Sequence, residues 1–301
     1  EQNYTTSPQT LTVIQRKHKA CNGNKIILPN KYMLPVLFDL LYSGWNLYKK
    51  HFRYYLPFIL VLLLISLGYT FFVQFFGPTQ GTVMARNYEE VISFLIVMVP
   101  MGLLAYYATL AVTLAMAKKS SGSSPGISTV YKNTLNRFPS TLGAYFLALF
   151  PITVAGVILV YLFYRAMTDV TPGAGALISI GVGSALFALG FIIFMWFSFS
   201  HLAALLDKHS PLGAVKYSYS LVHRRLASVI WRLLAPAVVI SLFAVVIGDI
   251  IEVIIKQAFS GSEQTILIAS TLTSTLIAIG LGPWGYAITI KLYEALKKPR
   301  E

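Results

Sequence analysis

The acidic residues that could do chemistry stand in or beside one long apolar stretch. Asp249, Glu252 and Lys256 fall near its end, and a charged residue inside a membrane usually marks an ion or substrate path. Because Asp249 lies about 20 residues into the stretch, or roughly 30 Å of helix, an interfacial helix end with an i, i+4 Glu252–Lys256 pair is the simpler interpretation. The alternative is a coupling or substrate site on a transport path. Its residues would be Asp249, Glu252, Ser270, Thr271 and Ser274.

The basic residues form a second group, placed where amphipathic segments meet apolar stretches. Cations in this position bind anionic phospholipid headgroups. We expect Lys49, Lys50, Arg53, Lys132, Arg137, Lys216, Arg224 and Arg225 to do so. The net charge of +13 would suggest nucleic acid for a soluble protein. Since the cations lie beside apolar stretches, anionic membrane lipid is the predicted partner and nucleic acid is not.

No pattern for catalysis or cofactor binding stands out. The sequence has no phosphate loop, dinucleotide fingerprint or HExxH motif. The one cysteine, Cys21, excludes an internal disulfide and a cysteine-based metal cluster. Glu89-Glu90 lacks the arginine four places on that intramembrane abortive-infection or CAAX-type proteases require. We therefore predict no catalytic residues, cofactor or metal, and an enzyme is the least favoured class.

The composition predicts the elements that must position these residues. With 56% hydrophobic and 12% charged residues, against about 25% charged in soluble domains, the chain is predicted to be an all-α polytopic membrane protein. Residues 1–33 are polar and are predicted to be a disordered tail, which leaves 34–300 as one membrane domain. Six apolar stretches are long enough to span a bilayer: about Tyr54–Phe76, Val91–Ala117, Thr141–Met167, Leu177–Leu206, Val229–Ile255 and Thr265–Leu292.

Amphipathic segments precede the first, third and fifth spans. They cover about Leu34–Arg53, Ile127–Phe138 and Leu212–Leu226, and the apolar face of the first comprises Leu34, Leu37, Phe38, Leu41, Trp45, Tyr48 and Phe52. Setting Phe52, Phe138 and Leu226 in register aligns an aromatic residue seven places before each. A period of about 87 residues then predicts a threefold repeat over 34–120, 121–208 and 209–297. The alternative is that any amphipathic helix entering a membrane has this pattern.

The repeat also predicts the topology. Each copy would cross the membrane twice, which places the three amphipathic helices and both termini on one side. All of the 24 Lys and Arg residues fall on that side except Arg86, Arg165 and Lys256. The positive-inside rule then places this side in the cytoplasm.

Three segments carry a resemblance to a known family. They are LFDLLYSGWNLYKKHFRYYLPFILVLLLI, SFSHLAALLDKHSPLGAVKYSYSLVHRRLASVIWRLL and GPWGYAITIKLYEALKKPRE. They resemble the bacterial six-span family of the glycerophosphoryl diester phosphodiesterase membrane domain and the YciC-like proteins, over about residues 34–300. The resemblance implies a six-span fold in a bacterial plasma membrane. In that family the phosphodiesterase is a separate soluble barrel, so the resemblance does not imply hydrolase activity for these residues.

Two functions follow as hypotheses. The first is a non-catalytic membrane module that binds anionic lipid and scaffolds or regulates another membrane or envelope protein. The second is a small-molecule or lipid transporter with a path between the repeats. A transporter requires a polar cavity within the membrane, lined by the Ser270–Thr275 hydroxyls or reached by Asp249, and a packed bundle without one would exclude it.

Overall fold

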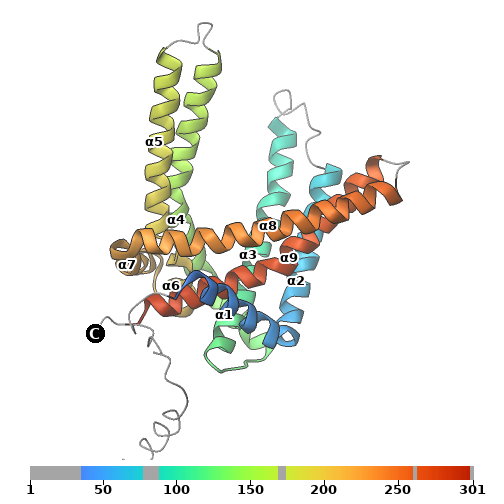
Figure 1. The fold of residues 1–301 in the computed structure, drawn as a ribbon, viewed down its shortest axis with the longest axis vertical. Helices are drawn as coiled ribbons and strands as arrows, with labels where there is room; N and C mark the ends of the chain where they lie inside the picture. The colour runs from blue at the N-terminus through green and yellow to red at the C-terminus, as the bar shows by residue number, and fades with distance from the viewer. Residues whose placement is uncertain (1–34, 77–87, 169–173, 260–262, 299–301) are drawn as a thin grey trace, which may run out of the picture. The chain divides into compact units, whose positions relative to one another are not determined.

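The computed structural model describes residues 35–76, 88–168, 174–259 and 263–298, and all regular elements within these residues are helices (Figure 1). Six of these helices are long and apolar enough to cross a membrane, so the predicted fold class is confirmed. The predicted tail, 1–33, lies outside the described residues. The elements are α1 (Leu37–Lys50), α2 (Phe52–Phe76), α3 (Tyr88–Ser120), α4 (Ile127–Thr168), α5 (Ala174–Trp196), α6 (Ser200–Leu206), α7 (Pro211–Val222), η2 (His223–Arg225), α8 (Leu226–Ala258) and α9 (Glu263–Leu296).

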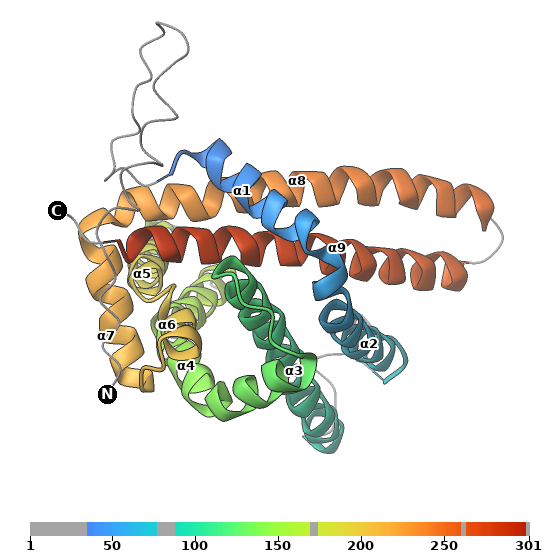
Figure 2. The same ribbon diagram turned by 90° about the horizontal axis from the view of Figure 1, so that it is seen from below.

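The long helices pack as consecutive pairs, α2 with α3, α4 with α5, and α8 with α9. Figures 1 and 2 show α4 beside α5 and α8 beside α9. Glycines allow the close approach of α5 to α4, since a Cβ atom at Gly190 would lie 3.0 Å from the Pro151 carbonyl oxygen and one at Gly183 would lie 2.8 Å from Leu159. Small residues commonly line membrane helix interfaces in this way.

The C-terminal half of α9 joins the pairs together. α9 contacts α1, α2, α3 and α8, and its buried residues contribute to both apolar clusters of the described chain: Ile279, Ala287 and Ile290 to one, and Ile288, Leu292, Tyr293 and Leu296 to the other. The N-terminal half of α9 instead runs along α8 (Figure 2). The segment GPWGYAITIKLYEAL is therefore core as well as membrane span.

The buried face of α1 differs from the predicted one. Leu40, Gly44 and Tyr48 are buried, whereas Phe38 is 77% exposed. The cause is α9, which α1 crosses (Figure 2). A Cβ atom at Gly44 would lie 2.6 Å from Cγ1 of Ile288, so only glycine allows this approach.

Two hydrogen bonds hold α1 on α9. Tyr48 Oη donates to the Gly280 carbonyl at 3.1 Å, and Trp284 Nε1 donates to the Leu41 carbonyl at 3.1 Å. Trp45 also packs edge-on against Trp284, with ring centroids 5.4 Å apart. The amphipathic helix is thus attached to the protein rather than resting on lipid alone.

The fourth predicted span, Leu177–Leu206, is broken in the structure. α5 ends at Trp196 and α6 begins at Ser200. Backbone groups freed by such a break need new partners within a membrane, and the buried Ser218 of α7 supplies them. Its hydroxyl donates to the Trp196 carbonyl at 2.9 Å and accepts from the Phe199 N–H at 3.1 Å.

The helices before the spans also differ from one another. His51 separates α1 from α2, and η2, a short 3-10 turn, separates α7 from α8. By contrast, the predicted helix Ile127–Phe138 continues directly into its span as α4. Helices begin at two of the three aligned positions, Phe52 and Leu226; the internal repeat itself stays a prediction.

Candidate anion-binding site at the basic end

The basic end is our name for the end of the membrane domain that contains α1, α6, α7, the starts of α2, α4 and α8, and the last turns of α3 and α9. Polar contacts join these elements: Ser140 Oγ donates to the His209 carbonyl at 2.8 Å, and Lys297 pairs with Asp207 at 2.6 Å. Of the described Lys and Arg residues, only Arg165 and Lys256 lie near the opposite ends of their helices. The charge is therefore strongly one-sided.

The end of α3 positions part of this charge. Gly122 has φ +84°, and its N–H bonds the Lys119 carbonyl at 3.1 Å, while the Ser123 N–H bonds the Lys118 carbonyl at 3.0 Å. This pattern is a Schellman C-cap, which glycine favours because it adopts positive φ without strain. The cap fixes the direction of the last turn, and the two lysines there are favoured by the negative end of the helix dipole.

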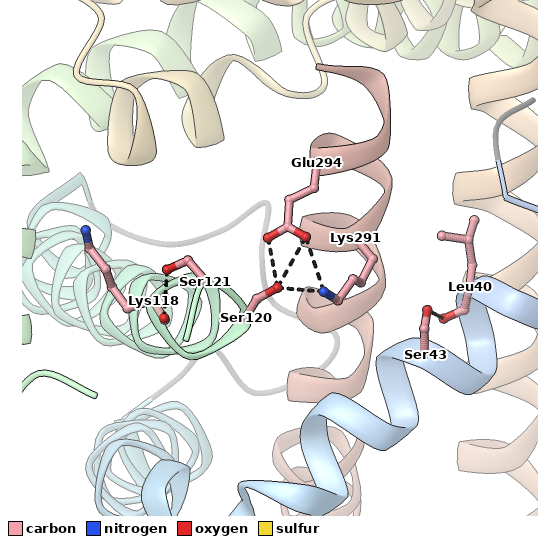
Figure 3. A network of polar contacts seen from close by, with 7 residues as sticks. All are labelled: Leu40, Ser43, Lys118, Ser120, Ser121, Lys291 and Glu294. Carbon is pink, nitrogen blue, oxygen red and sulfur yellow. Dashed lines mark hydrogen bonds and ion pairs between the residues drawn. The ribbon is translucent and has the colours of Figure 1, made fainter. Parts of the chain in front are cut away.

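A polar network links α3 to α9 (Figure 3). Lys291 Nζ donates to Ser120 Oγ at 2.6 Å and pairs with Glu294 at 3.2 Å, and the Ser120 hydroxyl donates to Glu294 Oε1 at 2.9 Å. All three side chains are partly buried. Glu294 therefore has two partners and partly neutralises Lys291.

Two polar cavities lie at the basic end. The first, here called the anion cavity, has a volume of about 450 Å³ and is lined by Asn46, Leu47, Lys50, His51, Lys119, Ser120, Gly122 and Lys291. The second, the mixed cavity, has a volume of about 340 Å³, and its charged lining residues are Lys118, Arg137, Asp207, Lys208, Glu294 and Lys297. Among the described residues, carboxylates thus line the mixed cavity but not the anion cavity.

The charged side chains that line the anion cavity, Lys50, Lys119 and Lys291, are all basic. Lys119 Nζ donates to Ser124 Oγ at 2.5 Å and lies 5.2 Å from the centroid of the Tyr54 ring. Partial burial, together with the charges of Lys119 and Lys50, lowers the pKa of His51 below its usual 6.5. The lysine charges, unlike the burial, favour an anion in the cavity.

The predicted headgroup residues are not brought to one place. Lys50 lines the anion cavity and Arg137 the mixed cavity. Lys49 lines an apolar groove with Trp45 and Phe52. The other five line neither polar cavity. Four of them are exposed, namely Arg53, Lys132, Lys216 and Arg224, and Arg225 is half-buried.

Sequence reasoning missed five lysines as site residues: four at the ends of α3 and α9, and Lys208 between α6 and α7. Lys118, Lys119, Lys208, Lys291 and Lys297 line the two polar cavities. The signal available was local: a Lys-Lys-Ser-Ser-Gly helix end, and lysines at i and i+6 around Glu294 on the last span. Their convergence depends on the packing of α3 and α1 against α9, which no local pattern encodes.

The predicted transport residues come together almost completely. Asp249, Glu252, Ser270 and Ser274 line a cavity of about 300 Å³ between α8 and α9. Thr271 does not line it, and its hydroxyl donates to the Leu267 carbonyl at 2.7 Å.

Two details qualify the chemistry of this cavity. The predicted Glu252–Lys256 pair is present at 2.6 Å, with both side chains largely exposed. The Ser270 Oγ atom is buried and has no hydrogen-bond partner among the described residues. An available hydroxyl beside two carboxylates could coordinate a cation, which is the chemistry of the alternative prediction.

No family model, curated protein or solved structure matches this chain. The family resemblance of the sequence therefore stays a prediction, and the functional argument rests on the geometry of the cavities and the distribution of charge.

Proposed function

We propose that this multi-pass protein is a non-catalytic module of a bacterial plasma membrane that binds anionic phospholipid headgroups at its basic end. In this role it scaffolds or regulates another membrane or envelope protein. The observation that carries the proposal is the one-sided charge: of the described Lys and Arg residues, only Arg165 and Lys256 lie near the opposite ends of their helices.

Both the position and the positive sign of these charges support lipid binding. Helix ends lie at the depth of the lipid headgroups, where each nearby Lys or Arg gains about 1 kcal/mol from an anionic leaflet. The positive-inside rule supports a cytoplasmic location for the basic end, with both termini on that side. In a bacterial inner membrane this orientation faces the cytoplasmic leaflet.

The test measures which lipids stay bound. The protein is reconstituted in nanodiscs of equal phosphatidylcholine and phosphatidylglycerol, released, and analysed by native mass spectrometry. We expect phosphatidylglycerol to be enriched several-fold among bound lipids, and the enrichment to fall in a variant with Lys50, Arg137, Arg224 and Arg225 all changed to Gln. The matched control, Arg165→Gln with Lys256→Gln, should keep it. Bound lipid in the input ratio for the wild-type protein would exclude the proposal.

A transporter is the second candidate, because four of the five predicted path residues line one cavity and the Ser270 hydroxyl there has no partner among the described residues. In a Cys21→Ser background, Ser274→Cys would then react with a membrane-impermeant thiol reagent. Leu276→Cys is the control, since this side chain is apolar, 51% exposed and outside the cavity. Equal, negligible labelling at both positions would exclude a water-filled path.

A further inference from the structure

We propose that the anion cavity is a specific phosphate site, taking the phosphate of an anionic lipid headgroup or a free phosphate ion. The inference deepens the proposed function and rests on it for the lipid source. It differs from a general attraction of lipid to basic residues, because it assigns binding to one cavity and to three lysines.

The three lysines converge from separate elements. Lys50 is the last residue of α1, Lys119 lies in the last turn of α3, and Lys291 lies on α9. Ammonium groups are strong charge-assisted donors to phosphate oxygens. The hydroxyl of Ser120 and the amide of Asn46 add polar groups to the same lining. The cavity thus offers several donors around one volume.

The charges of the cavity are incompletely compensated. Lys50 makes no hydrogen bond or ion pair with the described residues, and the carboxylate nearest to Lys291, that of Glu294, is shared with Ser120. Two full positive charges therefore remain beyond the Lys291–Glu294 pair. A phosphate would offset the repulsion between these lysine charges. Partial burial, and after it the charges of Lys119 and Lys50, lower the pKa of His51 in the same lining.

The mixed cavity is a weaker candidate for the same ligand. There Asp207 accepts hydrogen bonds from Tyr293 at 2.5 Å and from Lys297 at 2.6 Å. A phosphate would have to compete with this carboxylate and with Glu294, which also lines the mixed cavity. The anion cavity presents no such competitor in its lining.

The walls of the anion cavity are held in place before any ligand arrives. The hydrogen bonds from Tyr48 and Trp284 fix α1 on α9, and the Gly122 cap fixes the last turn of α3. A site whose donors are already positioned loses less entropy on binding. The fixed positions of α1, which carries Lys50, and of the end of α3, which carries Lys119, therefore favour binding at one specific site over diffuse attraction to the surface.

The experiment uses the full chain and two pairs of substitutions that remove the same charge. The test variant is Lys50→Gln with Lys119→Gln. The control is Lys132→Gln with Lys216→Gln, which changes two exposed lysines of the basic end that line neither polar cavity. Titration with short-chain phosphatidylglycerol in a neutral detergent, and separately with inorganic phosphate, gives the affinity of each variant. Thermal unfolding in detergent checks that both variants fold.

We expect the test variant to lose about tenfold or more in affinity, because two charge-assisted contacts to the phosphate are removed. The control should change less than about threefold. Loss with the lipid alone identifies a lipid headgroup as the ligand, and loss with both probes identifies phosphate in general. If the wild-type protein binds lipid but both variants weaken equally, the phosphate site is wrong and the proposed lipid binding stands. If the wild-type protein binds neither probe and shows no lipid enrichment, both are wrong.

Discussion

At the scale of single residues, Ser218 connects α5 and α6, which the sequence analysis predicted to be one continuous span. Its hydroxyl donates to the Trp196 carbonyl on one side of the break and accepts from the Phe199 N–H on the other. We expect Ser218→Ala to lower the free energy of unfolding by about 1–3 kcal/mol, since it leaves buried backbone groups unpaired. Thermal unfolding followed by circular dichroism measures the effect.

The matched control for this prediction lies on the same helix. Ser220 is exposed, and its hydroxyl donates only to the Tyr217 carbonyl of its own turn. Ser220→Ala should therefore change stability by less than about 0.5 kcal/mol. Equal effects at the two positions would contradict the bridging role of Ser218.

Gly44 is the residue on which the attachment of α1 depends. A side chain there would meet Ile288, including its backbone nitrogen at 3.2 Å, and overpacking of this kind costs about 1–3 kcal/mol. We expect Gly44→Val to detach α1, which proteolysis between α1 and α2 would detect. Gly102→Val is the control, because a Cβ atom at Gly102 meets nothing within 4 Å. Equal protease resistance of the two variants would show that α1 does not need this contact.

His51 predicts a pH dependence for lipid binding. Its pKa lies below 6.5 in the free protein, so the ring is neutral at pH 7 and gains a proton only as pH falls. A bound anion favours the protonated ring, so affinity for phosphatidylglycerol should rise as pH falls from about 7 to 5. The groups facing His51 are Lys50, Lys119 and the Tyr55 ring, and Lys291 lines the same cavity.

The phosphodiester of this probe does not titrate in that range, unlike a phosphomonoester with its second pKa near 6. A His51→Gln variant should therefore bind with an affinity that is flat over the same interval. A wild-type affinity that falls with decreasing pH, or an unchanged profile in the variant, would contradict the assignment of His51 to the site.

At the scale of elements, the sequence predicted what depends on local composition. Six apolar stretches became six span-length helices, and both helical breaks at His51 and His223 coincide with basic segments. The interruption at Phe197–Phe199 could not be predicted, because its compensation comes from Ser218, about one element away in sequence. Similarly, the predicted apolar face of α1 did not include Leu40 and Gly44, which are buried against α9 in the structure.

The two cavities also differ in how far the sequence could predict them. Asp249 and Glu252 share a cavity with Ser270 and Ser274 because α8 and α9 are consecutive and run side by side. The anion cavity needs α1, α3 and α9 to meet, and these are far apart in the sequence. Local patterns therefore found one of its lysines, Lys50, and missed Lys119 and Lys291.

At the scale of the whole molecule, the orientation in the membrane decides which lipids the basic end meets. The basic end is proposed to face the cytoplasm because positively charged loops stay on that side. An accessibility experiment tests the orientation: in a Cys21→Ser background, Ser121→Cys, in the exposed turn after α3, should resist an impermeant thiol reagent applied to intact cells. It should react once the inner membrane is opened. Labelling in intact cells would reverse the topology.

The most direct measurement locates bound lipid on the protein. A phosphatidylglycerol with a photoreactive group in its headgroup is cross-linked to the reconstituted wild-type chain, and the modified residues are identified by mass spectrometry. The account predicts cross-links on the elements of the basic end, with the strongest at the lining of the anion cavity around Lys50, Lys119 and Lys291. Cross-links confined to the last turns of α4 and α8, around Arg165 and Lys256, would contradict it.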